Sequence, residues 1–121
     1  MTKRVAGVFT AATDTRQVPA GTVIFDVGSS GEEMFGVVEG KVELRLPNGK
    51  TVLVGPDETF GEMALLESAT TRSATATTLE DTTLAVINKH RFLFLVHETP
   101  TFALNVMSSL ADRLRDMQEK A

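Results

Sequence analysis

Glu62 and Arg72 are an acid and a base ten positions apart, in a stretch made mostly of small and apolar residues, FGEMALLESATTRSATA at positions 60–76. The residues after Gly61 predict one short helical turn over Met63–Leu66. The first N–H groups of such a turn have no partner within it and can receive an anion, and Gly61 supplies backbone freedom where the chain enters the turn. The Arg72 guanidinium can donate two hydrogen bonds to phosphate oxygens. The stretch therefore predicts a phosphate-binding loop with a charged clamp.

Glu62 does not suit a phosphate contact, because like charges repel, but it suits a hydroxyl donor such as a ribose 2′-OH. An acceptor for a hydroxyl group next to a cation that binds a phosphate indicates a nucleotide whose phosphate lies close to its ribose. A 3′,5′-cyclic nucleotide has that geometry. Ala64, Ser73 and Ala74 are small, which leaves backbone N–H groups within reach of such a ligand. The simpler alternative is a structural ion pair between Glu62 and Arg72.

Short strands separated by turns are predicted to position this loop. The segments with strand character are 22–27, 34–38, 42–46, 51–54, 73–79 and 82–88. Asn48-Gly49 predicts a tight hairpin, because both residue types accept positive φ angles. Many short strands at close spacing favour a sandwich or barrel.

We therefore predict a mainly β fold with a helical tail. A short N-terminal arm would cover residues 1–14, and a jelly-roll-like β-barrel would cover residues 15–88, with the phosphate-binding cassette and its short helix at 60–76. C-terminal helices would fill residues 89–121, where Thr99-Pro100 separates a short helix, Lys89–His97, from a longer one.

The longer helix carries apolar residues at alternating spacings of four and three, which predicts an amphipathic helix of about five turns. These residues are Ala103, Met107, Leu110, Leu114 and Met117. The stripe is most simply explained as core packed against the barrel. Its spacing also resembles a coiled-coil seam, so a homodimer through residues 101–119 stays open. The charged residues between them are predicted to form a solvated face: Asp112, Arg113, Arg115 and Asp116.

Composition argues against several classes of protein. The net charge of −4 and the lack of a Lys or Arg cluster argue against a nucleic-acid partner. The absence of cysteine excludes disulfides and thiolate metal sites. We find no membrane segment, and the first residues make a poor signal peptide, so a cytoplasmic location is expected.

Catalytic and metal-binding patterns are also weak. His90 and His97 lie on the predicted short helix without a convincing third ligand, whereas cupin-type metalloenzymes draw histidines from strands, which here have none. No G-x-S-x-G turn supports a serine nucleophile. We therefore expect no metal, no cofactor and no enzymatic activity.

Two motifs carry a resemblance to a known family. Phe60-Gly61-Glu62-x-Ala64-Leu65, followed by Arg72-Ser73-Ala74, resembles the phosphate-binding cassette of the cyclic-nucleotide-binding domain family, which includes the catabolite activator protein, kinase regulatory subunits and gated channels. A second match is the glycine-punctuated segment Gly28-x-x-Gly31-x-x-Met34-Phe35-x-Val37-x-x-Gly40-x-Val42. Together the motifs place nearly the whole chain within this family pattern.

The resemblance implies a role for each matched residue. Glu62 would accept the ribose 2′-OH and Arg72 would pair with the cyclic phosphate, and the final helix would be a lid over the base. The remaining ligand-binding residues would be Gly61, Met63, Ala64, Ser73 and Ala74, with base contacts from Met117 and Gln118.

The expected function is that of a sensor, in which cyclic AMP, or with somewhat lower affinity cyclic GMP, binds and moves the C-terminal helix to act on a downstream protein. The runner-up is a degenerate barrel of the same family that serves only as a protein interaction module. The sequence does not identify the downstream partner or the oligomeric state.

Overall fold

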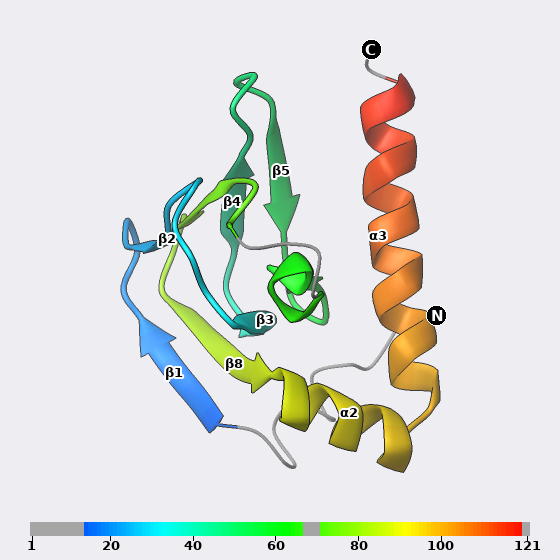
Figure 1. Cartoon of the computed structure of the whole chain (residues 1–121). Coiled ribbons are helices and arrows are strands. Elements are labelled where there is room, and N and C mark those ends of the chain that lie inside the picture. Colours follow the sequence, from blue (N-terminus) through cyan, green and yellow to red (C-terminus); the bar gives the residue numbers. More distant parts are fainter. Residues whose placement is uncertain (1–13, 67–70, 120–121) are drawn as a thin grey trace.

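A computed structural model describes residues 14–66 and 71–119, with side chains up to residue 116 (Figure 1). Within these residues, eight strands form two four-stranded antiparallel sheets, followed by the helices α2 and α3. The predicted mainly β fold with C-terminal helices is confirmed, as two packed sheets. Residues 1–13, most of the predicted N-terminal arm, lie outside the described part.

Each sheet is built from strands far apart in the sequence. The first holds, in spatial order, β1 (Asp14–Val18), β8 (Thr82–Asn88), β3 (Glu33–Glu39) and β6 (Thr59–Phe60). The second holds β2 (Val23–Phe25), β7 (Thr75–Thr78), β4 (Val42–Arg45) and β5 (Thr51–Val54). The predicted bounds of β5 and β8 are confirmed. The sequence analysis did not single out β1, which is polar and mostly exposed, or β6, which has two residues.

The core between the sheets follows from the alternation of side chains along each strand. Val37 and Phe60 from the first sheet and Val54 and Ala76 from the second are fully buried in one cluster. Burying each side chain of valine or phenylalanine size stabilises the fold by about 1.5–3 kcal/mol. This core joins the two sheets, and residues of the second sheet line the same space as the cassette.

The hairpin between β4 and β5 forms as predicted, but its turn differs from the tight two-residue type. The N–H of Gly49 donates to the carbonyl oxygen of Leu46 (2.9 Å), and Gly49 alone in this loop has a positive φ, 88°. Pro47 is the reason, since its fixed φ suits the second position of a type I turn, and Gly49 then takes the left-handed position of a three-residue loop.

The helices pack on the first sheet through a second core. Asn88 ends β8 and caps α2 (Lys89–Glu98), because its Oδ1 accepts the N–H of Arg91 at 2.8 Å. After Thr99-Pro100 the chain continues into α3 (Thr101–Glu119), whose Phe102 and Val106 are buried in this cluster. In Figure 1, α3 extends from there alongside β5. No helix in the described part is long and apolar enough to cross a membrane.

One prediction about α3 is wrong. The expected core stripe is largely exposed, with Met107, Leu110 and Leu114 at 55%, 39% and 58%. The buried face is instead the one carrying Phe102, Val106 and Ser109. Both faces have helical spacing, so periodicity could not decide which one meets the sheets; Phe102, the largest side chain, fills the space against α2.

Candidate functional site

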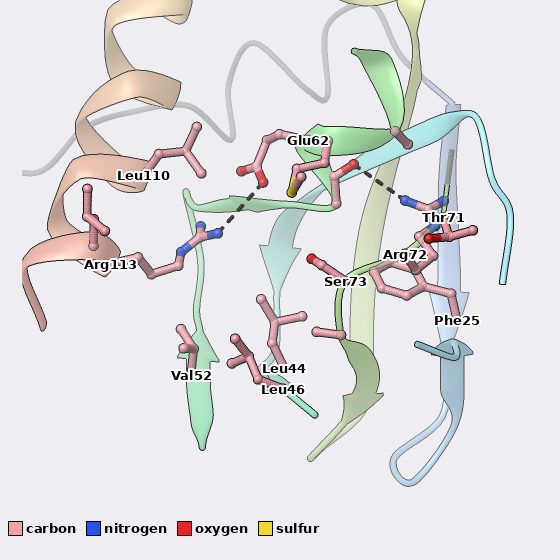
Figure 2. Close-up of a pocket in the computed structure, with 15 residues that line it drawn as sticks. Phe25, Leu44, Leu46, Val52, Glu62, Thr71, Arg72, Ser73, Leu110 and Arg113 are labelled. Carbon is pink, nitrogen blue, oxygen red and sulfur yellow. Dashed lines mark hydrogen bonds and ion pairs between the residues drawn. The ribbon is translucent and has the colours of Figure 1, made fainter. Parts of the chain in front are cut away.

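A cavity of about 190 Å³ lies between the second sheet, the cassette and α3 (Figure 2). Seven lining residues are those that the sequence analysis named in and around the cassette: Gly61, Glu62, Met63, Ala64, Arg72, Ser73 and Ala74. The short helix in the cassette, η1, is a 3₁₀ helix over Glu62–Leu65, one residue earlier than predicted. The fold therefore brings the two halves of the cassette together around one space.

Arg72 is held by both its backbone and its side chain. Its N–H donates to the carbonyl oxygen of Ser29 (2.7 Å), and its own carbonyl oxygen accepts from Gly28 (2.8 Å). The guanidinium lies 4.2 Å from the ring centroid of Phe25, within the range of a cation–π contact. Nη1 points at the carbonyl oxygen of Gly61 (3.4 Å), as the dashed line in Figure 2 marks.

The Arg72 side chain is nearly buried, with 8% of its surface exposed. Its Nε is buried without a hydrogen-bond partner among the described residues. Burial lowers the pKa of the Arg72 guanidinium below its ordinary value, and the negative charge of Glu33 opposes this change. A desolvated cation with unused donors is the environment in which an anion such as a phosphate binds strongly.

Two glycines make room for this arginine. A Cβ atom on Gly31 would lie 2.4 Å from Arg72 Nη2, so the glycine permits the guanidinium to pack on the backbone. Gly61 has a φ of 77°, which L-residues rarely adopt, and it begins η1. Its carbonyl oxygen accepts from both Arg72 and the N–H of Ala64 (3.2 Å).

Glu62 is engaged from the other side of the cavity. Its Oε2 accepts the hydroxyl of Thr59 at 2.6 Å, and its Oε1 lies 3.7 Å from Arg113 Nη1. In Figure 2 the side chains of Glu62 and Arg113 point toward one another. Within the described residues, the ion-pair partner of Glu62 is therefore Arg113 and not Arg72, which removes the simpler alternative of a structural pair within the cassette.

Arg113 is the residue that the sequence analysis missed. It was assigned to a solvated face, yet its side chain is only 15% exposed. Its Nη2 donates to the carbonyl oxygen of Thr59 and to Ser109 Oγ (3.1 Å). The available signal was its spacing, since Arg113 lies four positions after Ser109 and seven after Val106, on the buried face of α3. Asp112, Arg115 and Asp116 are exposed as predicted.

The rest of the cavity wall is apolar. Leu44, Leu46 and Val52 of the β4–β5 hairpin lie at its floor, and Leu110 and Leu114 border it from α3. A slot with apolar walls suits the flat ring of a base. The predicted base contacts Met117 and Gln118 belong to α3, but their side chains lie outside those that the structure describes.

The histidines lie elsewhere. His90 and His97 are exposed on α2, where His97 Nδ1 is 3.2 Å from Glu98. In the part of the chain described, no group of three or more His, Asp or Glu side chains is placed to hold a metal ion.

Comparison with known proteins identifies the family. Residues 15–99 match the model of the cyclic nucleotide-binding domain, and the chain therefore belongs to this family. It is 40% identical over 106 residues to the cyclic AMP receptor protein of Thermus thermophilus, covering 84% of this chain and 49% of that protein. It is 42% identical over 88 residues to a cyclic nucleotide-gated potassium channel of Mesorhizobium japonicum, covering 73% of this chain and 24% of the channel. The chain thus spans half or less of these relatives.

A solved structure supports the same conclusion. A protein from a study of a cyclic-GMP-dependent signalling pathway in bacterial phytopathogenesis superposes with a TM-score of 0.78 and 29% identity, covering 96% of this chain and 95% of that one. The resemblance found in the sequence is confirmed.

The contrast between the two arginines of the site gives a prediction. We expect Arg72→Met to leave the free energy of unfolding of the ligand-free protein within about 1 kcal/mol of wild type, because it removes a buried charge that Glu33 only partly offsets and keeps an apolar contact with Phe25. The matched variant Arg113→Met should lose about 1.5–3 kcal/mol, the usual value of hydrogen bonds to charged groups. Urea unfolding followed by circular dichroism measures both. A larger loss for Arg72→Met would mean that Arg72 serves the fold rather than a ligand.

Proposed function

We propose that this domain is a sensor that binds a 3′,5′-cyclic nucleotide in the cavity between the cassette and α3. The observation that carries the proposal is the buried Arg72, whose Nε has no partner among the described residues, in the same cavity as the acceptor Glu62. Arg72 pairs with the cyclic phosphate and Glu62 accepts the ribose 2′-OH. Gly61, Ala64 and Ser73 line the sugar and the phosphate, beside Met63 and Ala74.

The base lies in the apolar slot beneath α3. Apolar walls recognise any purine ring, and strong discrimination needs polar groups that the wrong base leaves unpaired. We therefore infer a modest preference for cyclic AMP over cyclic GMP, with Met117 and Gln118 as the nearest residues on the helix for contact with the base. Both nucleotides belong to the ligand class that the family binds.

The degenerate interaction module is the weaker hypothesis. In a barrel without a ligand, a desolvated arginine would bring no benefit, since burial of a charge that is only partly offset destabilises the fold. The cavity is present, and the hydrogen bond from Thr59 holds the Glu62 carboxylate at its wall. Both features favour a site that still binds a ligand.

Coupling to the C-terminal helix follows from the contacts of Glu62. In the proposed complex this carboxylate accepts the ribose hydroxyl, and it also faces Arg113 of α3 (Figure 2). A ligand hydroxyl that binds Glu62 adds a contact next to the site where α3 is attached to the cassette. Binding is thereby transmitted to α3, and through it to a downstream protein.

The exposed stripe of α3 supports a homodimer. Met107, Leu110 and Leu114 leave apolar surface exposed on α3, and two of them, Leu110 and Leu114, also border the nucleotide cavity. In a dimer two copies of α3 would cover these side chains from water.

The cytoplasmic location expected from the sequence stays a prediction.

The proposal predicts a specific loss of affinity. Calorimetric titration should find that Arg72→Met weakens cyclic AMP binding by about 30- to 4,000-fold, the effect of removing one partner of a buried charge pair. Cyclic GMP should bind wild type within about tenfold to a hundredfold of cyclic AMP. Arg45→Met is the matched control, because Arg45 is an exposed arginine on β4 paired with Glu43 at 3.3 Å. Equal affinities of wild type and Arg72→Met would reject the site, and wild type without affinity for either nucleotide would favour the interaction module.

The role of Glu62 predicts a dependence on the ribose hydroxyl. Wild type should bind 2′-deoxy cyclic AMP about tenfold or more weakly than cyclic AMP, because the charge-assisted hydrogen bond to the carboxylate is lost. Glu62→Gln should discriminate less between the two ligands, since the amide keeps an acceptor but not the charge. A double cycle of two proteins and two nucleotides measures the coupling. If wild type binds both ligands equally, Glu62 does not contact the ribose.

The link through Arg113 predicts a change in helix dynamics. Cyclic AMP should raise the hydrogen-exchange protection of amides in residues 101–116, and Arg113→Met should reduce this rise. Arg115→Met is the control on the same helix, because Arg115 is exposed and bonded only to Asp112 (2.9 Å) among the described residues. A rise in Arg113→Met equal to that of wild type would show that α3 receives the signal by another route.

A further inference from the structure

A second groove lies on the outer side of β5, between this strand and α3. The sheet order places β5 at the edge of the second sheet, paired with β4 on one side, and Figure 1 shows α3 running along its other side. The groove has a volume of about 620 Å³. Its walls are residues 49–53 with Glu58 on one side and Ser109, Asp112, Arg113 and Asp116 of α3 on the other.

The register of the hairpin decides which backbone groups face this groove. Leu46 donates its N–H to the carbonyl oxygen of Lys50 (2.8 Å), so this pair is a hydrogen-bonded one. Hydrogen-bonded and non-bonded pairs alternate along an antiparallel ladder. Val52 and Val54 therefore bond to β4, whereas the N–H and C=O groups of Thr51 and Leu53 point away from it. Both residues line the groove.

We propose that this groove binds an extended segment of a partner protein, which adds a strand to the free edge of β5. The N–H and C=O groups of Thr51 and Leu53 that point away from β4 supply main-chain hydrogen bonds to such a segment. The four residues of β5 span about 13 Å at 3.3 Å per residue, which is enough for a segment of about four residues. α3 closes the other side of the groove and holds the segment in line with the strand.

The side chains of the groove define the chemistry of this segment. Asp112 and Asp116 lie one helical turn apart on α3, and Glu58 lies across from them. Among these charged residues, Arg113 is paired with Glu62 (3.7 Å) and Asp112 with Arg115 (2.9 Å), which leaves Glu58 and Asp116 against Lys50. The groove thus favours basic side chains. Leu53 is 58% exposed and offers an apolar contact, so the segment alternates basic and apolar residues.

The groove and the nucleotide cavity share two wall residues, Val52 and Arg113. A nucleotide that moves Arg113 changes the α3 side of the groove, so affinity for the segment depends on the nucleotide. This coupling rests on the proposed function, whereas the binding of the segment to the edge does not.

The test uses three labelled hexapeptides and fluorescence anisotropy with the wild-type protein. The first is Lys-Val-Lys-Val-Lys-Val, the second has glutamate for lysine, and the third is the first peptide with N-methylated valines. We expect the basic peptide to bind, the acidic one not to bind, and N-methylation to weaken binding about fivefold or more, because main-chain donors are lost. Equal binding of the N-methylated or of the acidic peptide would overturn the proposal, as would no binding of any peptide at millimolar concentration.

Protein variants locate the site. Leu53→Pro removes an N–H that points into the groove and leaves the ladder with β4 intact, and proline is tolerated in edge strands. Leu53→Pro should weaken binding of the basic peptide more than Leu53→Ala does. Asp116→Asn should weaken binding of this peptide more than the remote control Glu80→Gln does. Equal effects within either pair would overturn the assignment. If Leu53→Pro does not fold, the N-methylated peptide decides with the wild-type protein alone.

Two further measurements separate the remaining explanations. If sedimentation finds a dimer that Leu53→Pro makes monomeric and that the peptide does not compete with, a second copy occupies the edge and the proposal is wrong.

The titrations are repeated with saturating cyclic AMP. If cyclic AMP binds and leaves the peptide affinity unchanged, the coupling is overturned. If cyclic AMP does not bind at all, the proposed function fails, while peptide binding that depends on Leu53 and the main chain still supports the groove.

Discussion

The site depends on one buried cation. Moving a guanidinium out of water is unfavourable unless other groups replace its hydration, and in this domain the replacement is partial. Phe25 stacks beneath Arg72, the carbonyl oxygen of Gly61 lies at its tip, and Gly31 leaves space for it, but Nε has no partner in the described part of the chain. A bound phosphate would complete this environment. Gly31 is needed because the guanidinium lies directly against its backbone, and Gly61 is needed because its φ of 77° is one that L-residues rarely adopt.

The other charged residues of the cavity form a separate and better satisfied network. Glu62 is bonded to Thr59 and faces Arg113, which also bonds to Ser109 and to the carbonyl oxygen of Thr59. This network joins the cassette, β6 and α3, and in the proposed complex it would connect a ligand hydroxyl at Glu62 to the helix. The two arginines thus differ in their surroundings, since Arg72 keeps a buried Nε without a partner among the described residues, whereas Arg113 attaches α3 to the cassette and to β6.

The second half of α3 is attached to the sheets less firmly than the first. Phe102 and Val106 anchor its beginning in the core with α2, whereas Leu114 is exposed and Arg113 provides the main polar attachment. A helix fixed at one end and held by a few bonds further along can change its angle at low energetic cost. The same arrangement leaves an apolar face and the open edge of β5 available to other molecules.

The sequence by itself determined the features that depend on neighbouring residues. The residues of the cassette that line the cavity, the strands at 51–54 and 82–88 and the existence of the hairpin could be predicted, because spacing, alternation and turn residues act locally. The family could be recognised for the same reason, since its motifs are contiguous. Tertiary structure alone decided which face of α3 meets the sheets, because both faces have helical spacing and only packing against α2 and η1 distinguishes them. That choice brought Arg113 to Glu62 and exposed the stripe around Leu110, and the packing of distant strands likewise placed Phe25 beneath Arg72.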